Sequence, residues 1–222
     1  MKLFIPIALA LCASGNAGTV LFSDLGPGGS FTTSVGSILQ GSNGNTRQSI
    51  TQAREFTVSG TGSFDVTGFD LAVFVNGGGS SFAAAIFTNN GALPGTQIGS
   101  SYDLTANTFC GATCYSVASQ TGVTGITLTG GSHYWMVLGP QSLTDSSENI
   151  WRGNDQGATS LLVASLDGGQ HWITENGGLQ TNAAFSVIGD AAVSGVPEPS
   201  YVVLVAGGLL AVVVKKRVRP VA

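Results

Sequence analysis

Apolar residues in the middle of this chain recur at every second position. One such stretch is SFDVTGFDLAVFVN, whose alternate positions carry Phe69, Leu71, Val73 and Val75. Successive side chains of a strand point to opposite faces, so this alternation predicts strands with one face in a core. The chain also has 33 glycines, many of them in short Gly-Gly and Asn-Gly pairs between these runs. Together these features predict antiparallel sheets connected by tight turns.

Three further segments follow the same pattern. ITLTGGSHYWMVLG and TSLLVASLDGGQHWITEN each place a glycine-containing turn between two strands, and AAFSVIGD supplies a last strand. No convincing amphipathic helix lies between residues 19 and 192, while residues 47–57 (RQSITQAREFT) allow either a helical turn or an edge strand. We therefore predict an all-β domain over residues 18–190, an antiparallel β-sandwich of jelly-roll-like form.

The charges restrict the partners of this domain. All three lysines lie near the chain ends, and residues 19–195 carry three arginines against eleven carboxylates, a net charge of −8. Such a surface cannot neutralise phosphates, so nucleic-acid binding is excluded. Only 9% of the chain is charged, against about a quarter in an ordinary soluble domain. A surface rich in Ser, Thr, Asn and Gln suits a protein exposed outside the cell.

The N-terminus predicts export. Lys2 is followed by the apolar run LFIPIALAL and then by small residues. This run is too short to cross a bilayer, and the pattern indicates a signal peptide over residues 1–17 that signal peptidase removes. The alternative, a lipoprotein signal at Cys12, is disfavoured because Leu11 is bulky where a small residue is needed.

Two cysteines remain after this cleavage, Cys110 and Cys114, within TFCGATCYS. In an oxidising compartment a close even pair indicates a disulfide, here worth about 2 kcal/mol because the loop is short. A metal site is the alternative, but two thiolates without a second pair or neighbouring histidines make a poor zinc site. We expect the disulfide.

The C-terminal segment combines three parts. A linker over residues 191–200 precedes an apolar run over residues 201–214 and a basic tail over residues 215–222. A helix of that run would span about 21 Å at ~1.5 Å per residue, less than the ~30 Å hydrocarbon core. Long basic side chains at its end could make up part of the difference and would stay in the cytoplasm. This predicts a short transmembrane helix with the β domain outside.

Within the linker lies a Val-Pro-Glu-Pro motif at residues 196–199. This motif, the apolar run and the terminal basic cluster, in this order, closely resemble the PEP-CTERM sorting signal, a segment also labelled an ice-binding protein C-terminal domain. The match covers about the last twenty-five residues. It implies export in a Gram-negative bacterium and processing by an exosortase, an integral-membrane cysteine protease. The residues recognised by the protease would be Pro197, Glu198 and Pro199. A permanent C-terminal anchor with an incidental Pro-Glu-Pro is the alternative.

The body resembles choice-of-anchor R-type surface domains. The resemblance rests on FTNNGALPGTQIGSSYDL, GSHYWMVLGP and NIWRGND and covers most of residues 20–190. It implies a β-rich extracellular module without an assigned catalytic activity, and it brings no site residues with it.

The sequence offers little catalytic chemistry. It has only two histidines, His133 and His171, each beside an aromatic residue in a predicted strand, and it lacks a Gly-x-Ser-x-Gly motif. We expect no enzyme activity and no cofactor. Calcium ligands are conceivable at Asp155, Asp167 and Glu175, but Asp-Gly and Asn-Gly pairs favour hairpin turns there. Thr127-Leu128-Thr129 alone does not make the regular threonine array of an ice-binding face.

Saccharide binding is the stronger alternative. The chain has three tryptophans, Trp135, Trp151 and Trp172, and Trp151 precedes the polar loop RGND. We predict a sugar site at Trp151 and Asp155, against the interpretation that all three rings are core residues. The most economical function is an exported protein of the bacterial envelope or exopolysaccharide matrix with a structural or adhesive role. A carbohydrate-binding module of the same compartment is the alternative.

Overall fold

The computed structural model describes residues 18–108 and 116–192, and these residues form an all-β domain of antiparallel sheets, as predicted. The five-stranded sheet has the order β1 (Thr19–Ser23), β14 (Phe185–Ala191), β4 (Ser63–Leu71), β8 (Ala118–Thr121), with β9 (Thr127–Thr129) also paired to β4. The six-stranded sheet has the order β13 (Ile173–Thr181), β12 (Thr159–Ser165), β3 (Thr51–Thr57), β10 (His133–Gly139), β6 (Ser81–Asn90), β7 (Leu93–Thr105). The three-stranded sheet has the order β2 (Gly36–Gln40), β11 (Glu148–Arg152), β5 (Val73–Gly77).

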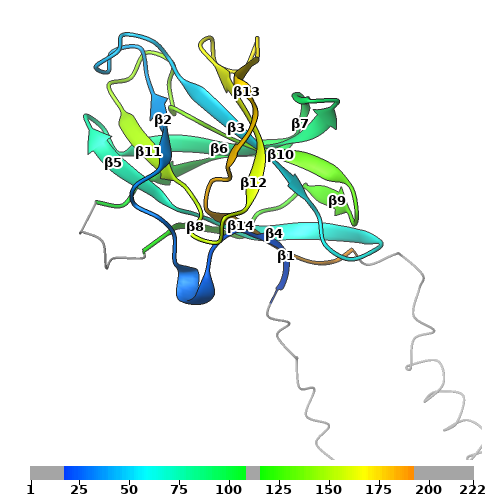
Figure 1. The fold of residues 1–222 in the computed structure, drawn as a ribbon. Helices are drawn as coiled ribbons and strands as arrows, with labels where there is room; N and C mark the ends of the chain where they lie inside the picture. The colour runs from blue at the N-terminus through cyan, green and yellow to red at the C-terminus, as the bar shows by residue number, and fades with distance from the viewer. Residues whose placement is uncertain (1–17, 109–115, 193–222) are drawn as a thin grey trace, which may run out of the picture. The chain divides into compact units, whose positions relative to one another are not determined.

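These sheets share one main core. Figure 1 shows β2, β11 and β5 on one side of the domain, β7 and β9 on the other, and β1, β14 and β4 along its lower part. Phe185 of the five-stranded sheet meets Phe56 of the six-stranded sheet edge to face, with ring centroids 5.7 Å apart. Trp151 of the three-stranded sheet contacts the same Phe185 ring at 5.5 Å. Aromatic residues from all three sheets therefore hold the domain together at one point.

The alternating run over residues 63–76 is divided between two sheets at Ala72. The Ala72 N–H donates to the carbonyl of Ala184, and its own carbonyl accepts from the N–H of Arg152. Phe69 and Leu71 point into the main core, whereas Ala72 and Phe74 belong to a second buried cluster. Both faces of this run are therefore buried at the crossing, where the alternation had indicated one face in water.

Residues 47–57 contain the strand β3 and not a helical turn, which confirms the strand alternative, but the predicted position at a sheet edge was wrong. β3 lies inside the six-stranded sheet, paired with β10 on one side and β12 on the other. Gln52 and Arg54 lie on the inward face of β3 together with Phe56. Polar residues at these positions suggested an exposed strand, and this is why the central position of β3 was not predicted.

Two glycine-rich turns have different roles. Asp167-Gly168-Gly169 connects β12 and β13, which pair as a hairpin. The Gly130-Gly131 turn instead moves the chain from β9 in the five-stranded sheet to β10 in the six-stranded sheet. Gly131 has a φ of 76°, a left-handed conformation that suits glycine.

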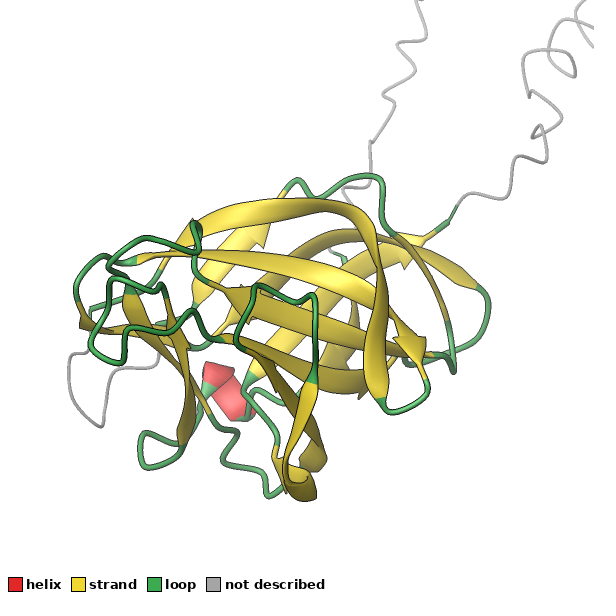
Figure 2. Ribbon diagram, turned by 90° about the horizontal axis from the view of Figure 1, so that it is seen from above, coloured by secondary structure: helices red, strands yellow, loops and turns green. Residues whose placement is uncertain are grey.

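Helical structure in residues 18–108 and 116–192 is confined to the 3₁₀ turn Pro27–Gly29, drawn in red in Figure 2. No helix of these residues has the length and apolar character needed to cross a bilayer. The predicted signal peptide (residues 1–17), the Cys110–Cys114 disulfide and the C-terminal segment from residue 193, with Pro197, Glu198 and Pro199, lie outside the described residues.

Candidate functional site

Trp151 lies in the core. Its side chain is 0% exposed, packs on Phe185, and donates from Nε1 to the carbonyl of Ala184 at 3.4 Å. The ring has no face open to a ligand, because β11 lies in the middle of the three-stranded sheet and points this residue inward. The sugar-stacking role predicted for Trp151 therefore does not fit its position, and its large ring serves packing.

The other two tryptophans cover the outer face of the six-stranded sheet. Trp135 is fully buried, and its Nε1 donates to Asn89 Oδ1 at 2.9 Å. Trp172 is half-buried against the same cluster, which includes Ala53 and Val163. β10 is thus buried on both faces, with Met136 on the side of the main core.

Asp155 is exposed on the loop that follows β11. Hydrogen bonds from Gln156 and then Ser30 lower the pKa of its carboxyl group below the ordinary value. The loop is fixed by Asn154, whose Oδ1 accepts from the N–H groups of Gln156 and Ala158, both at 3.0 Å. Asp155 therefore serves a turn, and the structure does not bring its carboxylate together with the Trp151 ring.

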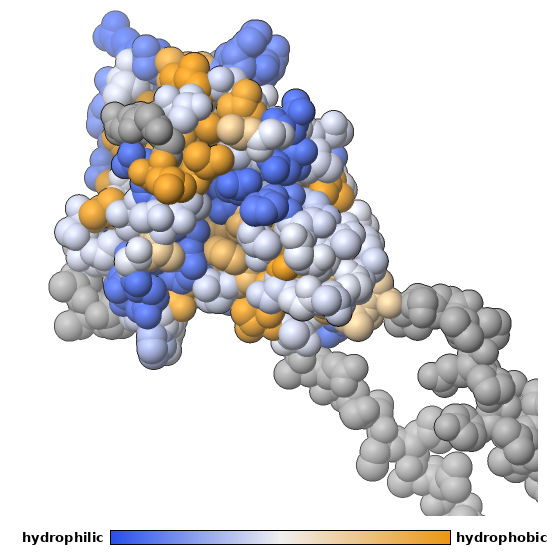
Figure 3. Space-filling view, turned by 45° about the vertical axis from the view of Figure 1, so that its right-hand side comes forward, coloured by the Kyte–Doolittle hydropathy of each residue, from blue (hydrophilic) through white to orange (hydrophobic). Residues whose placement is uncertain are grey.

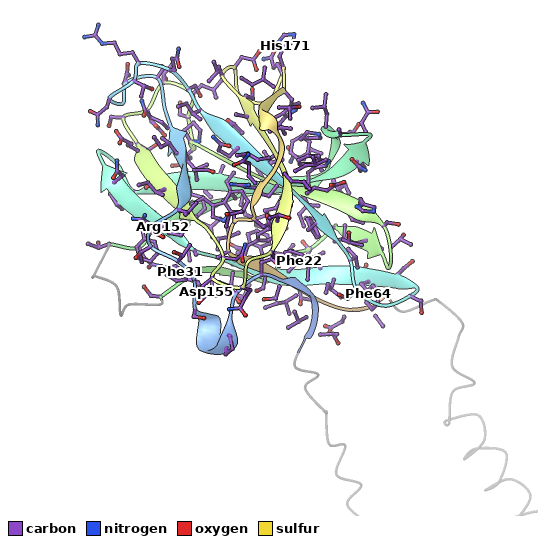
Figure 4. All side chains as sticks on the ribbon, viewed as in Figure 1. Phe22, Phe31, Phe64, Arg152, Asp155 and His171 are labelled. Atoms are coloured by element: carbon purple, nitrogen blue, oxygen red, sulfur yellow. The ribbon has the colours of Figure 1, made fainter. Side chains whose placement is uncertain are left out.

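The turn at Asp167 lies at the opposite end of the domain, where Figure 4 labels His171. Asp167 Oδ1 accepts from the N–H groups of Gln170 (3.1 Å) and His171 (2.9 Å), and its Oδ2 contacts His171 Nδ1 at 2.5 Å. The hydrogen bond with His171, followed by that with Ser165, holds the Asp167 pKa well below its ordinary value. These contacts describe a hairpin turn, in agreement with the interpretation favoured by the Asp-Gly sequence.

The remaining histidine, His133, is exposed at the start of β10. Its Nδ1 lies 3.3 Å from Glu55 Oε1 and 3.3 Å from Thr57 Oγ1. Across residues 18–108 and 116–192, no group of three His, Cys, Asp or Glu side chains is arranged to hold a metal ion.

The candidate site is a cleft of about 560 Å³ between the three-stranded and six-stranded sheets. Its walls are β2 on one side and β3, β12 and β13 on the other. The two sheets are joined at one end by an antiparallel bridge between Gln40 and Ile50. Residues of the two walls that lie away from this bridge, such as Gly36 and Thr181, line the cleft without pairing to each other.

The cleft has a polar floor and an apolar rim. Its apolar lining includes four exposed side chains: Val35, Ile38, Leu166 and Ile173. Figure 3 shows a similar mixture on the face in view, where apolar and hydrophilic side chains lie next to one another. The polar lining residues are Ser37, Gln48, Gln52, Arg54, Gln180 and Thr181. A surface of this kind can contact the apolar face of a ligand and also bond to its polar groups.

Two floor residues define the chemistry. Arg54 is 3% exposed, is the only charged residue among the described residues that line the cleft, and donates from Nη2 to Ser37 Oγ at 2.9 Å. Gln52 is 4% exposed, and its Oε1 accepts no hydrogen bond from the described part of the protein. A buried amide oxygen requires a donor, which a water molecule or a ligand hydroxyl group could supply. The floor is therefore suited to a hydroxylated, neutral or anionic ligand.

Sequence reasoning missed this cleft, although one signal was present. Arg54 stands two residues before Phe56 on the same face of β3, so an arginine occupies a position where the alternation expects an apolar side chain. The walls come from segments more than a hundred residues apart in the sequence, and no local pattern brings them together. No protein-family model matches the chain, and no curated protein matches it.

Proposed function

We propose that this chain is an exported protein of the bacterial envelope or exopolysaccharide matrix, sorted through its C-terminal segment and cleaved by an exosortase. The sorting proposal is supported by one observation: Pro197-Glu198-Pro199 is followed by the apolar run over residues 201–214 and then by basic residues. The β domain acts by contact, in a structural or adhesive role, and not by catalysis. Its low charge and its hydroxyl-rich and amide-rich surface support a place among polysaccharides.

We further propose that the domain is a β-sandwich of jelly-roll-like form. The packing of the five-stranded and six-stranded sheets on one core supports this description. The three-stranded sheet continues from the five-stranded sheet through Ala72 and adds the wall that makes the cleft.

The intact mass of the mature protein, recovered from membrane and extracellular fractions of its host, tests the sorting. We expect a species that begins near Gly18 and ends near Pro199, with any extra mass marking a new attachment. A membrane-bound species that keeps residues 201–222 would show a permanent anchor and overturn exosortase processing. The same spectra, compared with and without reductant, test the Cys110–Cys114 disulfide through the mass of two hydrogens.

Saccharide binding in the cleft is the second candidate function. It is supported by Gln52 and Arg54 on the floor and by the exposed apolar rim. Because the Gln52 amide oxygen on the floor accepts no hydrogen bond from the described residues, we propose that the ligand presents hydroxyl groups to it. The backbone edge of β2 adds further polar groups along the wall.

A glycan array probed with the full chain in detergent tests this second candidate. We expect glycan binding that weakens several-fold in the variants Gln48→Ala and Ile173→Ala, whose side chains line the cleft. Val20→Ala is the matched control, because Val20 is an exposed apolar residue of β1 outside the cleft. Binding that the two cleft variants leave unchanged, or no binding to any glycan, would rule out the cleft as a saccharide site.

A further inference from the structure

A buried carboxylate lies at the beginning of β11, away from the floor of the cleft. Glu148 is 6% exposed. One of its carboxylate oxygens contacts the side-chain amide of Asn45 at 2.5 Å, and the other contacts the side-chain amide of Asn76. Both asparagines are exposed, so the carboxylate lies beneath a pair of amides that face the solvent.

Three separate segments bring these residues together. The backbone of Glu148 pairs with Gln40 of β2 and with Gly77 of β5, which follows Asn76. Asn45 lies on the connection from β2 to β3. The residues just before it are held against the loop that precedes β11, through Ser42 N–H to Leu143 O at 2.8 Å and Asn43 N–H to Asp145 O at 3.0 Å.

No cation among the described residues pairs with the charge of Glu148. In the ranges 18–108 and 116–192, His133 pairs with Glu55 and His171 pairs with Asp167, and neither pair involves Glu148. A buried carboxylate is normally paired with a cation or bound to a metal, because removing it from water is unfavourable. Two neutral amides compensate only part of that loss. A cation from solution would supply the missing charge.

The arrangement of donors selects the cation. The amide of Asn45 lies beside one carboxylate oxygen of Glu148 and the amide of Asn76 beside the other, and a half-turn of each amide would replace its N–H group with its carbonyl oxygen there. Four oxygens, two of them from the carboxylate, would then be available to a cation, and water could complete its shell from the side of the exposed asparagines. Calcium takes about six to eight oxygen ligands at ~2.3–2.6 Å in flexible geometry, whereas magnesium requires a tighter octahedron.

We propose that Asn45, Asn76 and Glu148 form a calcium site that ties the β2–β3 connection to β5 and β11. Extracellular modules bind calcium with dissociation constants of about 10⁻⁴ to 10⁻³ M, matched to the calcium present outside cells. A single carboxylate with two amides belongs at this weak end of the range. The site is independent of the saccharide cleft, so either proposal can fail without the other.

Titration of the full chain in detergent with calcium chloride, after removal of metal with a chelator, tests the site. We expect one calcium ion per chain by calorimetry, weaker binding of magnesium, and a rise in the midpoint of thermal unfolding with added calcium. An absence of calcium heat and of any shift in that midpoint would overturn the proposal. Tighter binding of magnesium than of calcium would overturn the choice of metal.

Variants locate the binding. Glu148→Gln keeps the shape of the side chain and removes its charge, and we expect calcium affinity to fall at least about tenfold. If this buried variant does not fold, Asn45→Ala and Asn76→Ala, which change exposed side chains, should each weaken binding several-fold. Asn90→Ala, at the exposed end of β6, and Glu55→Gln, on β3, are the matched controls. Calcium binding that is equal in all of these proteins would place the ion elsewhere and overturn the site.

Discussion

Arg54 Nη2 donates a hydrogen bond of 2.9 Å to Ser37 Oγ, and this bond links β3 to β2 beneath the cleft. Both residues are buried. The bond connects strands of different sheets, 17 residues apart in the sequence, at the level where the two walls of the cleft diverge. The width of the cleft therefore depends on this contact together with the Gln40–Ile50 bridge.

Replacement of Ser37 with alanine is expected to destabilise the domain by about 2 kcal/mol, because a buried hydrogen bond to a charged group is lost. Ser100→Ala, at an exposed position of β7, is the control and should change stability by less than about 0.5 kcal/mol. Urea unfolding of both variants measures the difference. Equal stability of the two variants would mean that the contact contributes nothing.

Alanine substitutions at Gly78 and Gly91 would distinguish the cost of backbone strain from the cost of steric overlap. Both have positive φ angles, 62° and 68°. A Cβ on Gly91 would meet nothing within 4 Å, whereas one on Gly78 would overlap the carbonyl oxygen of Ser146. We expect Gly91→Ala to cost about 1–2 kcal/mol through its left-handed backbone alone, and Gly78→Ala to cost about 1–3 kcal/mol more through overpacking. Thermal unfolding midpoints that fall by the same amount in both variants would contradict this separation.

Asp24 should make stability depend on pH in an unusual direction. Burial raises the pKa of its carboxyl above 3.8, opposed in part by the hydrogen bond from Asn182. The folded state therefore holds this proton more tightly than the unfolded state. Its contribution to stability is present below pH 3.8 and is lost as the pH rises through the folded pKa.

The variant Asp24→Asn tests this linkage. It should be more stable than the unmodified protein at about pH 7, by less than about 1 kcal/mol because Asp24 is only half-buried, and the gain should vanish at about pH 3. Urea midpoints at the two pH values give the comparison. Asp190→Asn, which removes the same charge near the end of β14, reports the effect of net charge alone. A gain that is the same at both pH values would refute the linkage.

Replacement of Trp151 with alanine should destabilise the domain more than replacement of Trp172. Trp151→Ala removes a fully buried ring from the main core and should cost about 3–5 kcal/mol. Trp172→Ala truncates a half-buried ring and should cost clearly less. Chemical unfolding measures the loss of stability in both variants. In a separate variant, Trp172→Phe, most of the tryptophan fluorescence that acrylamide can quench should disappear. Strong quenching that persists in that variant would show that Trp135 or Trp151 is exposed.

The sequence pattern predicted the positions of individual strands better than it predicted which strands pair with one another. Alternation located β4, β10 and β14, because each has a face of large apolar side chains that only a strand can bury together. It did not reveal that the chain changes sheets at Ala72 and at Gly130-Gly131. The alternation of apolar residues in a strand is the same whichever sheet the strand joins. β3 was misplaced for the same reason, because Arg54 and Gln52 look like surface residues until β2 is placed opposite them.

The residues of the candidate sites could not be predicted from local context. An aromatic residue beside a polar loop, as in Trp151 and Asp155, has the same appearance whether the ring lies on a surface or under a second sheet. The cleft and the Glu148 cluster depend on contacts between distant segments, such as Asn45 with Glu148, 103 residues apart. Such contacts become visible only when the sheets are assembled.

The first and last strands of the domain lie side by side, with Thr19 opposite Gly189, and β14 is also bonded to β4 along its other edge. Tension applied to the chain beyond Ala191 would enter a strand that is held on both sides. Such a strand yields by shear, because hydrogen bonds to β1 and to β4 must break together and cannot open one at a time. The point at which the chain leaves β14 is therefore expected to be among the parts of the domain that best resist tension.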